Sequence, residues 1–224
     1  MVIPETLWDG RGPPALSDNS SGMTRPPVHQ DSRPATEGPP VRYDAVIISL
    51  HWLLALLITV SFGLGVYMTD LAVSPTRLRL YNWHKWAGVT ILALSALRLV
   101  WRRGHPPPEL PAPLAASMPR WQHTMLHAMH RAMYVLFFAV PLAGWAYSSA
   151  EGFPVSWFGV LQLPDFVPVN HDLAEALYKP LHAGCAFALA ALVALHVLAV
   201  LKHQWIDGAE LLARMWPARR KDAP

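Results

Sequence analysis

The sequence has little charge and almost no cysteine. Only 15% of its 224 residues are charged, whereas 53% are hydrophobic, and a soluble domain ordinarily carries more charge than this. The single cysteine, Cys185, excludes an internal disulfide. No basic segment followed by a short apolar segment precedes Arg42, so we expect no cleavable signal peptide. The small net positive charge gives no reason to expect a nucleic-acid partner.

What the chain has instead is long apolar runs. They lie at Ala45–Met68, Trp83–Trp101, Ala132–Ser149 and Pro180–Leu201. Each is long enough to cross a hydrocarbon core of roughly 30 Å. The sequence therefore predicts an all-α integral membrane protein, a four-helix bundle over residues 42–217, in contact with membrane lipid. Residues 1–41 are rich in proline and lack an apolar face, which predicts a disordered arm, and residues 218–224 form a basic tail.

The basic residues are divided unequally between the two predicted membrane faces. They concentrate before the first run, in the connection between the second and third runs, and in the C-terminal tail, whereas the long loop before the fourth run is acidic. Basic loops stay on the cytoplasmic side of a membrane. Both termini are therefore predicted to face the cytoplasm.

The segment Tyr178–Lys202, which contains the fourth run, includes two histidines. His182 and His196 are fourteen positions apart, which puts both rings on nearly one helix face and about 21 Å apart along the axis. Polar side chains inside a membrane helix are costly and mark functional sites. Haem fits best, because an imidazole can bind its iron axially and the flat macrocycle fills apolar space.

Two further histidines lie at matching depths in other runs. His51 lies about six residues inside the cytoplasmic end of the first run, close to the depth of His196. His84 lies at the outer start of the second run, level with His182. The sequence therefore predicts an inner pair, His51 with His196, and an outer pair, His84 with His182, each holding one haem iron between two helices. No CxxCH motif occurs, so both haems would be bound non-covalently.

Glycine and arginine recur near these positions. Gly65 and Gly144 each follow a histidine by fourteen positions, and Gly88 lies one helical turn from His84. A glycine has no Cβ, so a porphyrin could approach the backbone there. Arg98 also lies within an apolar run, where a haem propionate would supply its anion.

A second group of histidines precedes the third run. His123, His127 and His130 recur at i, i+4 and i+7 and so share one helix face. Three uses are open: a metal site, a substitute ligand for the inner haem, and proton handling at a quinone pocket. We hypothesise that quinone binds at the cytoplasmic face near His127, His130 and His203, because quinone reduction consumes protons as well as electrons.

With these residues in view, the chain from Arg42 to Pro217 resembles the bacterial cytochrome b561 family. The resemblance is carried by five segments that occur in order: RYD…SLHWL around His51, YNWHKWAG around His84, LSALRLVWR around Arg98, HAMHRAMY around His130, and LHAGCAFALAALVALH ending at His196.

The resemblance implies a membrane oxidoreductase of the bacterial inner membrane, with two b haems held by bis-histidine ligation at the four paired positions. Members of the family transport electrons between the outer face and the quinone pool, with superoxide as donor and ubiquinone as acceptor in the best-understood branch. The alternative is a cytochrome b subunit that relays electrons for a protein redox partner, such as a membrane dehydrogenase or hydrogenase complex. A haem-free helical adaptor would leave the paired histidines unexplained.

Two lysines flank the predicted outer haem. Lys85 follows His84 directly, and Lys179 precedes His182 by three positions. A small anionic donor such as superoxide would meet a locally positive surface there, since nearby charges dominate once salt screens distant ones. Both lysines are equally consistent with ordinary anchoring at the membrane surface.

Overall fold

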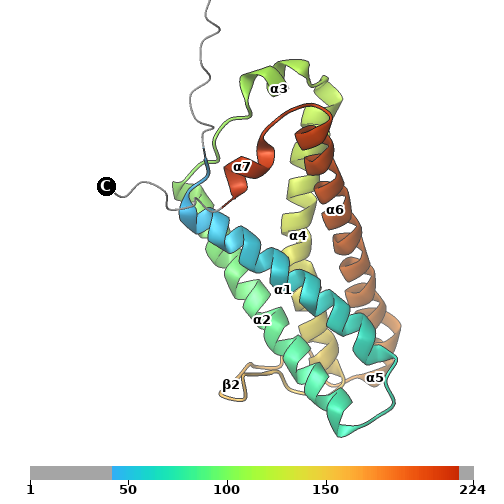
Figure 1. The fold of residues 1–224 in the computed structure, drawn as a ribbon. Coiled ribbons are helices and arrows are strands. Elements are labelled where there is room, and N and C mark those ends of the chain that lie inside the picture. The colour runs from blue at the N-terminus through green and yellow to red at the C-terminus, as the bar shows by residue number, and fades with distance from the viewer. Residues whose placement is uncertain (1–41, 217–224) are drawn as a thin grey trace, which may run out of the picture. The chain divides into compact units, whose positions relative to one another are not determined.

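The computed structural model describes residues 42–216, and these are mostly helical (Figure 1). The predicted arm over residues 1–41 and the predicted tail over residues 218–224 lie outside the described residues. The helices expected from the apolar runs are present, and two of them begin well before the runs do.

The first two long helices follow the first two runs. Helix α1 (Ala45–Thr69) begins where Asp44 caps it, with the carboxylate accepting a hydrogen bond from the Val46 amide at 2.8 Å. Helix α2 (Pro75–Gly104) begins eight residues before the predicted run. The Ser74 hydroxyl accepts from the Arg77 amide at 3.2 Å, and proline at the first position suits a helix start. Polar residues in the first turns of α2 hid this start from an analysis based on apolar runs.

The other long helices are α4 (Arg120–Ala150) and α6 (Lys179–Trp205). Helix α4 begins twelve residues before its apolar run and contains Pro141. Helix α6 continues directly from the short helix α5 (His171–Leu173) and a π-helical turn, η1 (Ala174–Tyr178).

Short elements complete the described chain. They are the helices α3 (Ala112–Ser117) and α7 (Leu211–Met215) and an antiparallel hairpin of two two-residue strands, β1 (Ser156–Trp157) and β2 (Leu161–Gln162). The expectation of an all-α chain is therefore correct apart from this hairpin, which lies in the connection between α4 and α5.

The long helices pack in a consistent order. Helix α1 packs on α2, α2 on α4, and α4 on α6. Met133 and Phe137 of α4 and Leu189 of α6 form the buried core cluster. This packing brings residues from four helices around one interior space.

Three helical segments in residues 42–216 are long and apolar enough to span a membrane. They are Ala45–Thr69, Arg120–Ala150 and His171–Trp205. Helix α2, which was predicted as a fourth span, is not among them. It is long enough, but it carries six basic residues: Arg77, Arg79, Lys85, Arg98, Arg102 and Arg103. Charge is what separates α2 from the other three.

Candidate functional site

The four histidines predicted as ligands lie in two groups. We keep the names outer pair, for His84 and His182, and inner pair, for His51 and His196, after the predicted orientation. The ring centroids of the outer pair are 5.9 Å apart and those of the inner pair 6.4 Å apart. Helix α6 carries one member of each pair, so the two groups are separated along that helix.

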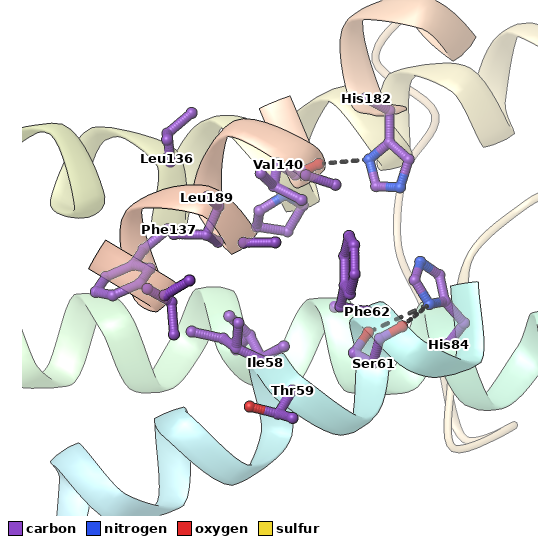
Figure 2. Close-up of a pocket in the computed structure, with 17 residues that line it drawn as sticks. Ile58, Thr59, Ser61, Phe62, His84, Leu136, Phe137, Val140, His182 and Leu189 are labelled. Atoms are coloured by element: carbon purple, nitrogen blue, oxygen red, sulfur yellow. Dashed lines mark hydrogen bonds between the residues drawn. The ribbon is translucent and has the colours of Figure 1, made fainter. Parts of the chain in front are cut away.

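Each ring of the outer pair is held by a backbone carbonyl of a neighbouring helix. The Nδ1 atom of His84 lies 3.0 Å from the Ser61 carbonyl oxygen of α1, and that of His182 lies 2.9 Å from the Val140 carbonyl oxygen of α4 (Figure 2). A carbonyl can only accept, so Nδ1 carries the proton in both rings. The Nε2 atom of each ring is then unprotonated, as a metal-binding nitrogen must be.

A glycine follows each acceptor by four residues. A Cβ added to Gly65 would lie 3.1 Å from Cε1 of His84, and one added to Gly144 would lie 2.9 Å from Cε1 of His182. The imidazole rings of the outer pair therefore lie directly beside these two glycines. Gly88 differs, because no other atom lies within 4 Å of its added Cβ.

A cavity of about 260 Å³ adjoins the outer pair. All four long helices contribute to its wall, and both histidines and Gly88 line it (Figure 2). Most other lining side chains are aliphatic or aromatic, with Phe137 and Leu189 from the core among them. An apolar cavity with two imidazoles and an open glycine face suits a flat apolar ligand that binds axially through a metal.

The inner pair has polar and cationic neighbours. The Arg98 Nη2 atom lies 3.3 Å from His51 Nδ1. A guanidinium can only donate, so this nitrogen of His51 accepts, which is the reverse of the outer pair. Iron bound at Nε2 of His51 would require a proton on Nδ1, and Arg98 would then need another acceptor. A haem propionate is such an acceptor.

Unpaired polar atoms beside the inner pair fit that assignment. Within residues 42–216, Arg98 Nε and the Tyr134 hydroxyl are buried without a hydrogen-bond partner. The Tyr134 ring lies 5.7 Å from the guanidinium carbon of Arg98 and equally far from that of Arg102. Buried donors are normally satisfied, and the carboxylates of a bound haem would satisfy these.

A third ring joins the inner pair. The centroid of His130 on α4 lies 5.4 Å from that of His196, closer than His51 does. Its Nδ1 atom donates to the Leu126 carbonyl at 2.7 Å, which leaves Nε2 unprotonated. The geometry therefore keeps His130 available as a substitute ligand.

The other histidines of the predicted quinone and metal group differ in their surroundings from His130. His127 is exposed, and His203 Nδ1 lies 2.5 Å from the Asp207 carboxylate. A hydrogen bond from the Lys202 ammonium, with a further one from His203, lowers the pKa of the Asp207 carboxyl below its usual range. Among residues 42–216 no group of three or more His, Cys, Asp or Glu side chains could hold a metal ion, so the metal-site alternative for His123, His127 and His130 is not supported.

The two lysines near the outer pair differ in their contacts. Lys179 forms an ion pair with Glu175, with 2.6 Å between Nζ and Oε2. Lys85 donates to the Phe153 carbonyl at 3.4 Å and lies over the Phe153 ring. The carboxylate compensates the charge of Lys179, a partner the sequence analysis did not anticipate.

Sequence reasoning missed three residues of the site. Ser61 and Val140 act through backbone carbonyls, which leave no signal in side-chain identity. Tyr134 ends the HAMHRAMY segment, and its position one turn from His130 was a usable signal.

Facing imidazoles between apolar helices define a class of membrane protein that binds a flat metal macrocycle. The sequence profile of the family described as prokaryotic cytochrome b561 matches residues 42–218. The chain belongs to this family, which confirms the resemblance found in the sequence.

Curated relatives agree with this assignment. The chain is 32% identical to "Cytochrome b561 homolog 2" of Escherichia coli (strain K12) over 180 residues, which cover 79% of this chain and 92% of that protein. It is 30% identical to "Cytochrome b561 homolog 1" of the same organism, over 80% of this chain and 99% of the relative. It is 28% identical to "Probable superoxide oxidase CybB" of Yersinia pestis, over 80% and 98% respectively.

Family membership fixes the general activity. Cytochromes b561 bind haem b and transfer electrons in a membrane, and the candidate spans agree with a bacterial membrane protein. The protein is therefore a membrane oxidoreductase.

Proposed function

We propose that the protein is a di-haem cytochrome b that transfers electrons between a donor at the outer face of the inner membrane and the quinone pool. Helices α1, α2, α4 and α6 form a four-helix transmembrane bundle in this proposal, with both termini in the cytoplasm. The observation that carries it is the presence of two separate groups of facing imidazoles, one between α2 and α6 and the other between α1 and α6.

The chain's own residues have defined tasks in this proposal. His84 and His182 bind the outer haem iron through Nε2, and their Nδ1–H groups stay bonded to carbonyls. His51 and His196 bind the inner iron. Haem b, when bound, supplies reversible one-electron oxidation and reduction. With an imidazole from each of two helices to hold the iron, each site would favour electron transfer over oxygen binding.

Arg98 and Tyr134 hold the propionates of the inner haem in this proposal. Within the described part of the chain, Arg98 Nε and the Tyr134 hydroxyl are buried without a partner, and the carboxylates of a bound haem would supply acceptors for both. Gly88 would let the outer haem lie close to the α2 backbone, since the space beside it is open. Gly65 and Gly144 instead leave room for the rings of His84 and His182.

Superoxide is the donor and ubiquinone the acceptor that we favour. The relative from Yersinia pestis is described as a probable superoxide oxidase, which supports the first. Lys85 is the better candidate for attracting a small anion, because Lys179 is paired with Glu175 at 2.6 Å, whereas Asp165 acts on Lys85 without such a close ion pair. For quinone we propose the cytoplasmic face near His127, His130 and His203. His130 is the most central of these, since its ring contacts His196.

Purified protein tests the proposal directly. Haem extracted from the single chain should amount to two per polypeptide, and superoxide should reduce it in the absence of any other subunit. Added ubiquinone should reoxidise it. One haem per chain would contradict the two-site assignment. Two haems that superoxide cannot reduce would favour the alternative of a subunit that serves a protein redox partner.

A further inference from the structure

The connection between α4 and α5 exposes a large apolar surface. Between Gly152 and Asn170 there is one charged residue, Asp165. Six large apolar side chains in this connection are more than half exposed: Phe153, Phe158, Val160, Leu161, Phe166 and Val169. Val160, beside the hairpin turn, is 90% exposed.

The connection at the other end of the helices behaves differently. The segment between α2 and α4 is also poor in charge, with Glu109 alone between His105 and Pro119. There, however, Leu114 and Met118 are buried. A low charge content therefore does not by itself expose apolar side chains, and the hairpin connection needs its own explanation.

The hairpin is fixed to the side of α2. The Trp86 indole donates to the Ser156 carbonyl at 2.6 Å, and the Trp157 indole donates to the Thr90 hydroxyl at 3.1 Å. Figure 1 shows β2 beside α2. The exposed side chains are therefore held in place by two partly buried hydrogen bonds from tryptophan and do not belong to a loose loop.

The residues of α2 to which the hairpin is bonded lie at the depth of the membrane-spanning part of α1. His84 contacts Ser61, which is eight residues, or about 12 Å, before the end of α1 at Thr69. Trp86 and Thr90 follow His84 by two and six residues on α2, which places them about 3 Å and 9 Å further from the level of Thr69. The hairpin thus adjoins the apolar length of α1, not the water beyond its end.

The hairpin backbone is largely self-paired. Strands β1 and β2 pair in the register Trp157 with Leu161, the Val160 amide donates to the Trp157 carbonyl at 3.0 Å, and the Leu163 amide donates to the Val155 carbonyl at 2.8 Å. Irregular backbone is tolerated at membrane depth only where its polar groups are satisfied. This hairpin meets that condition.

The turn keeps an aromatic residue where the backbone disfavours one. Phe158 has φ of 50° and Gly159 has φ of 72°. Such a turn prefers asparagine or glycine at the first position. The Phe158 ring lies against the rings of Trp86 and Trp157, with centroids 5.2 Å apart in both pairs, and 55% of the residue stays exposed beyond these contacts.

We propose that this hairpin is a membrane-surface anchor that inserts Phe158, Val160 and Leu161 into the outer leaflet beside α2. The ligand it fits is the acyl-chain layer of that leaflet, because these three side chains carry no polar group and lie at the depth of membrane-spanning sequence. The anchor also covers α2, which is the least apolar of the four long helices by composition. It is independent of which donor or quinone the protein uses.

Nitroxide accessibility in lipid vesicles tests this. The full chain with Cys185→Ala offers a background without cysteine, in which Val160→Cys and the control Asp172→Cys are each spin-labelled and reconstituted into phosphatidylethanolamine and phosphatidylglycerol vesicles. Asp172 is exposed on α5, outside the hairpin. We expect the Val160 label to collide several-fold more with oxygen, relative to a water-soluble nickel chelate, than the Asp172 label does.

Two results would overturn the anchor. Equal preference for the nickel chelate at both labels would place the hairpin in water. Protection of the Val160 label from both reagents would show that protein covers the surface, and dipolar broadening between labels would identify that protein as a second copy of this chain. The haem content of the labelled protein reports that the fold is intact, so neither result can be attributed to misfolding.

Discussion

The outer and inner histidine groups differ in how completely the protein prepares them. In the outer pair, a carbonyl of a neighbouring helix holds Nδ1 of each ring, and a glycine makes room for it. In the inner group, His51 accepts from Arg98, and a third ring, His130, lies within reach of His196. The outer pair has one arrangement that can bind a metal through Nε2, whereas the inner group has more than one.

This difference has a physical basis in the groups that each region supplies. Backbone carbonyls are fixed by the helices and can only accept, so they select one imidazole tautomer. Arginine and a surface-proximal histidine are side chains that can exchange partners. A rigid second layer suits a site that must keep its ligands, and an adaptable one would suit the proton and quinone handling that we propose for the inner group.

Substituting the predicted histidine ligands should show the difference between the outer and inner groups most clearly. His182→Ala should reduce haem from two per chain to one, because the outer pair has no substitute ring. His51→Ala should retain part of the inner haem, since His130 can supply an imidazole, and His51→Ala with His130→Ala should lose it. Haem quantification with reduced-minus-oxidised spectra measures this. Complete inner-haem loss from His51→Ala alone would remove His130 as a substitute.

Substitutions at Gly144 and Gly65 test whether the rings of the outer pair are held rigidly. Gly144→Ala adds a Cβ at 2.9 Å from the His182 ring and Gly65→Ala one at 3.1 Å from the His84 ring, so each should displace its ring from its carbonyl. We expect haem affinity at the outer site to fall about 10- to 100-fold, with the larger loss for Gly144→Ala. Gly63→Ala is the matched control, because open space surrounds its added Cβ. A loss as large in the control would mean that helix packing, not ring seating, is disturbed.

The smallest effect concerns the inner cation. Arg98→Gln removes a buried positive charge, which should stabilise ferric haem and lower the inner midpoint potential by ~90 mV, the equivalent of about 2 kcal/mol. Arg98→Lys keeps the charge and should shift the potential less. Potentiometric titration followed by absorbance resolves the two haems. An equal shift of the outer potential would show that Arg98 does not act on the inner site in particular.

Much of this protein follows from local sequence. The apolar runs, the fourteen-residue interval from His182 to His196 and the matching depths of His51 and His84 all follow from the pitch and rise of one helix, which do not depend on its neighbours. The sequence segments around these histidines were enough to show the resemblance to the cytochrome b561 family before any tertiary contact was known.

Only the tertiary structure decided which contacts form between the helices. The carbonyls of Ser61 and Val140 have no side-chain signature, and the contacts of Gly65 and Gly144 with imidazole depend on how closely two helices pack. The Glu175–Lys179 ion pair is different, because it joins residues four positions apart along one helical stretch, a spacing that the sequence already contains. Sequence periodicity places a residue on a face and at a depth, but the partner that meets it there is set by packing between segments far apart in the chain.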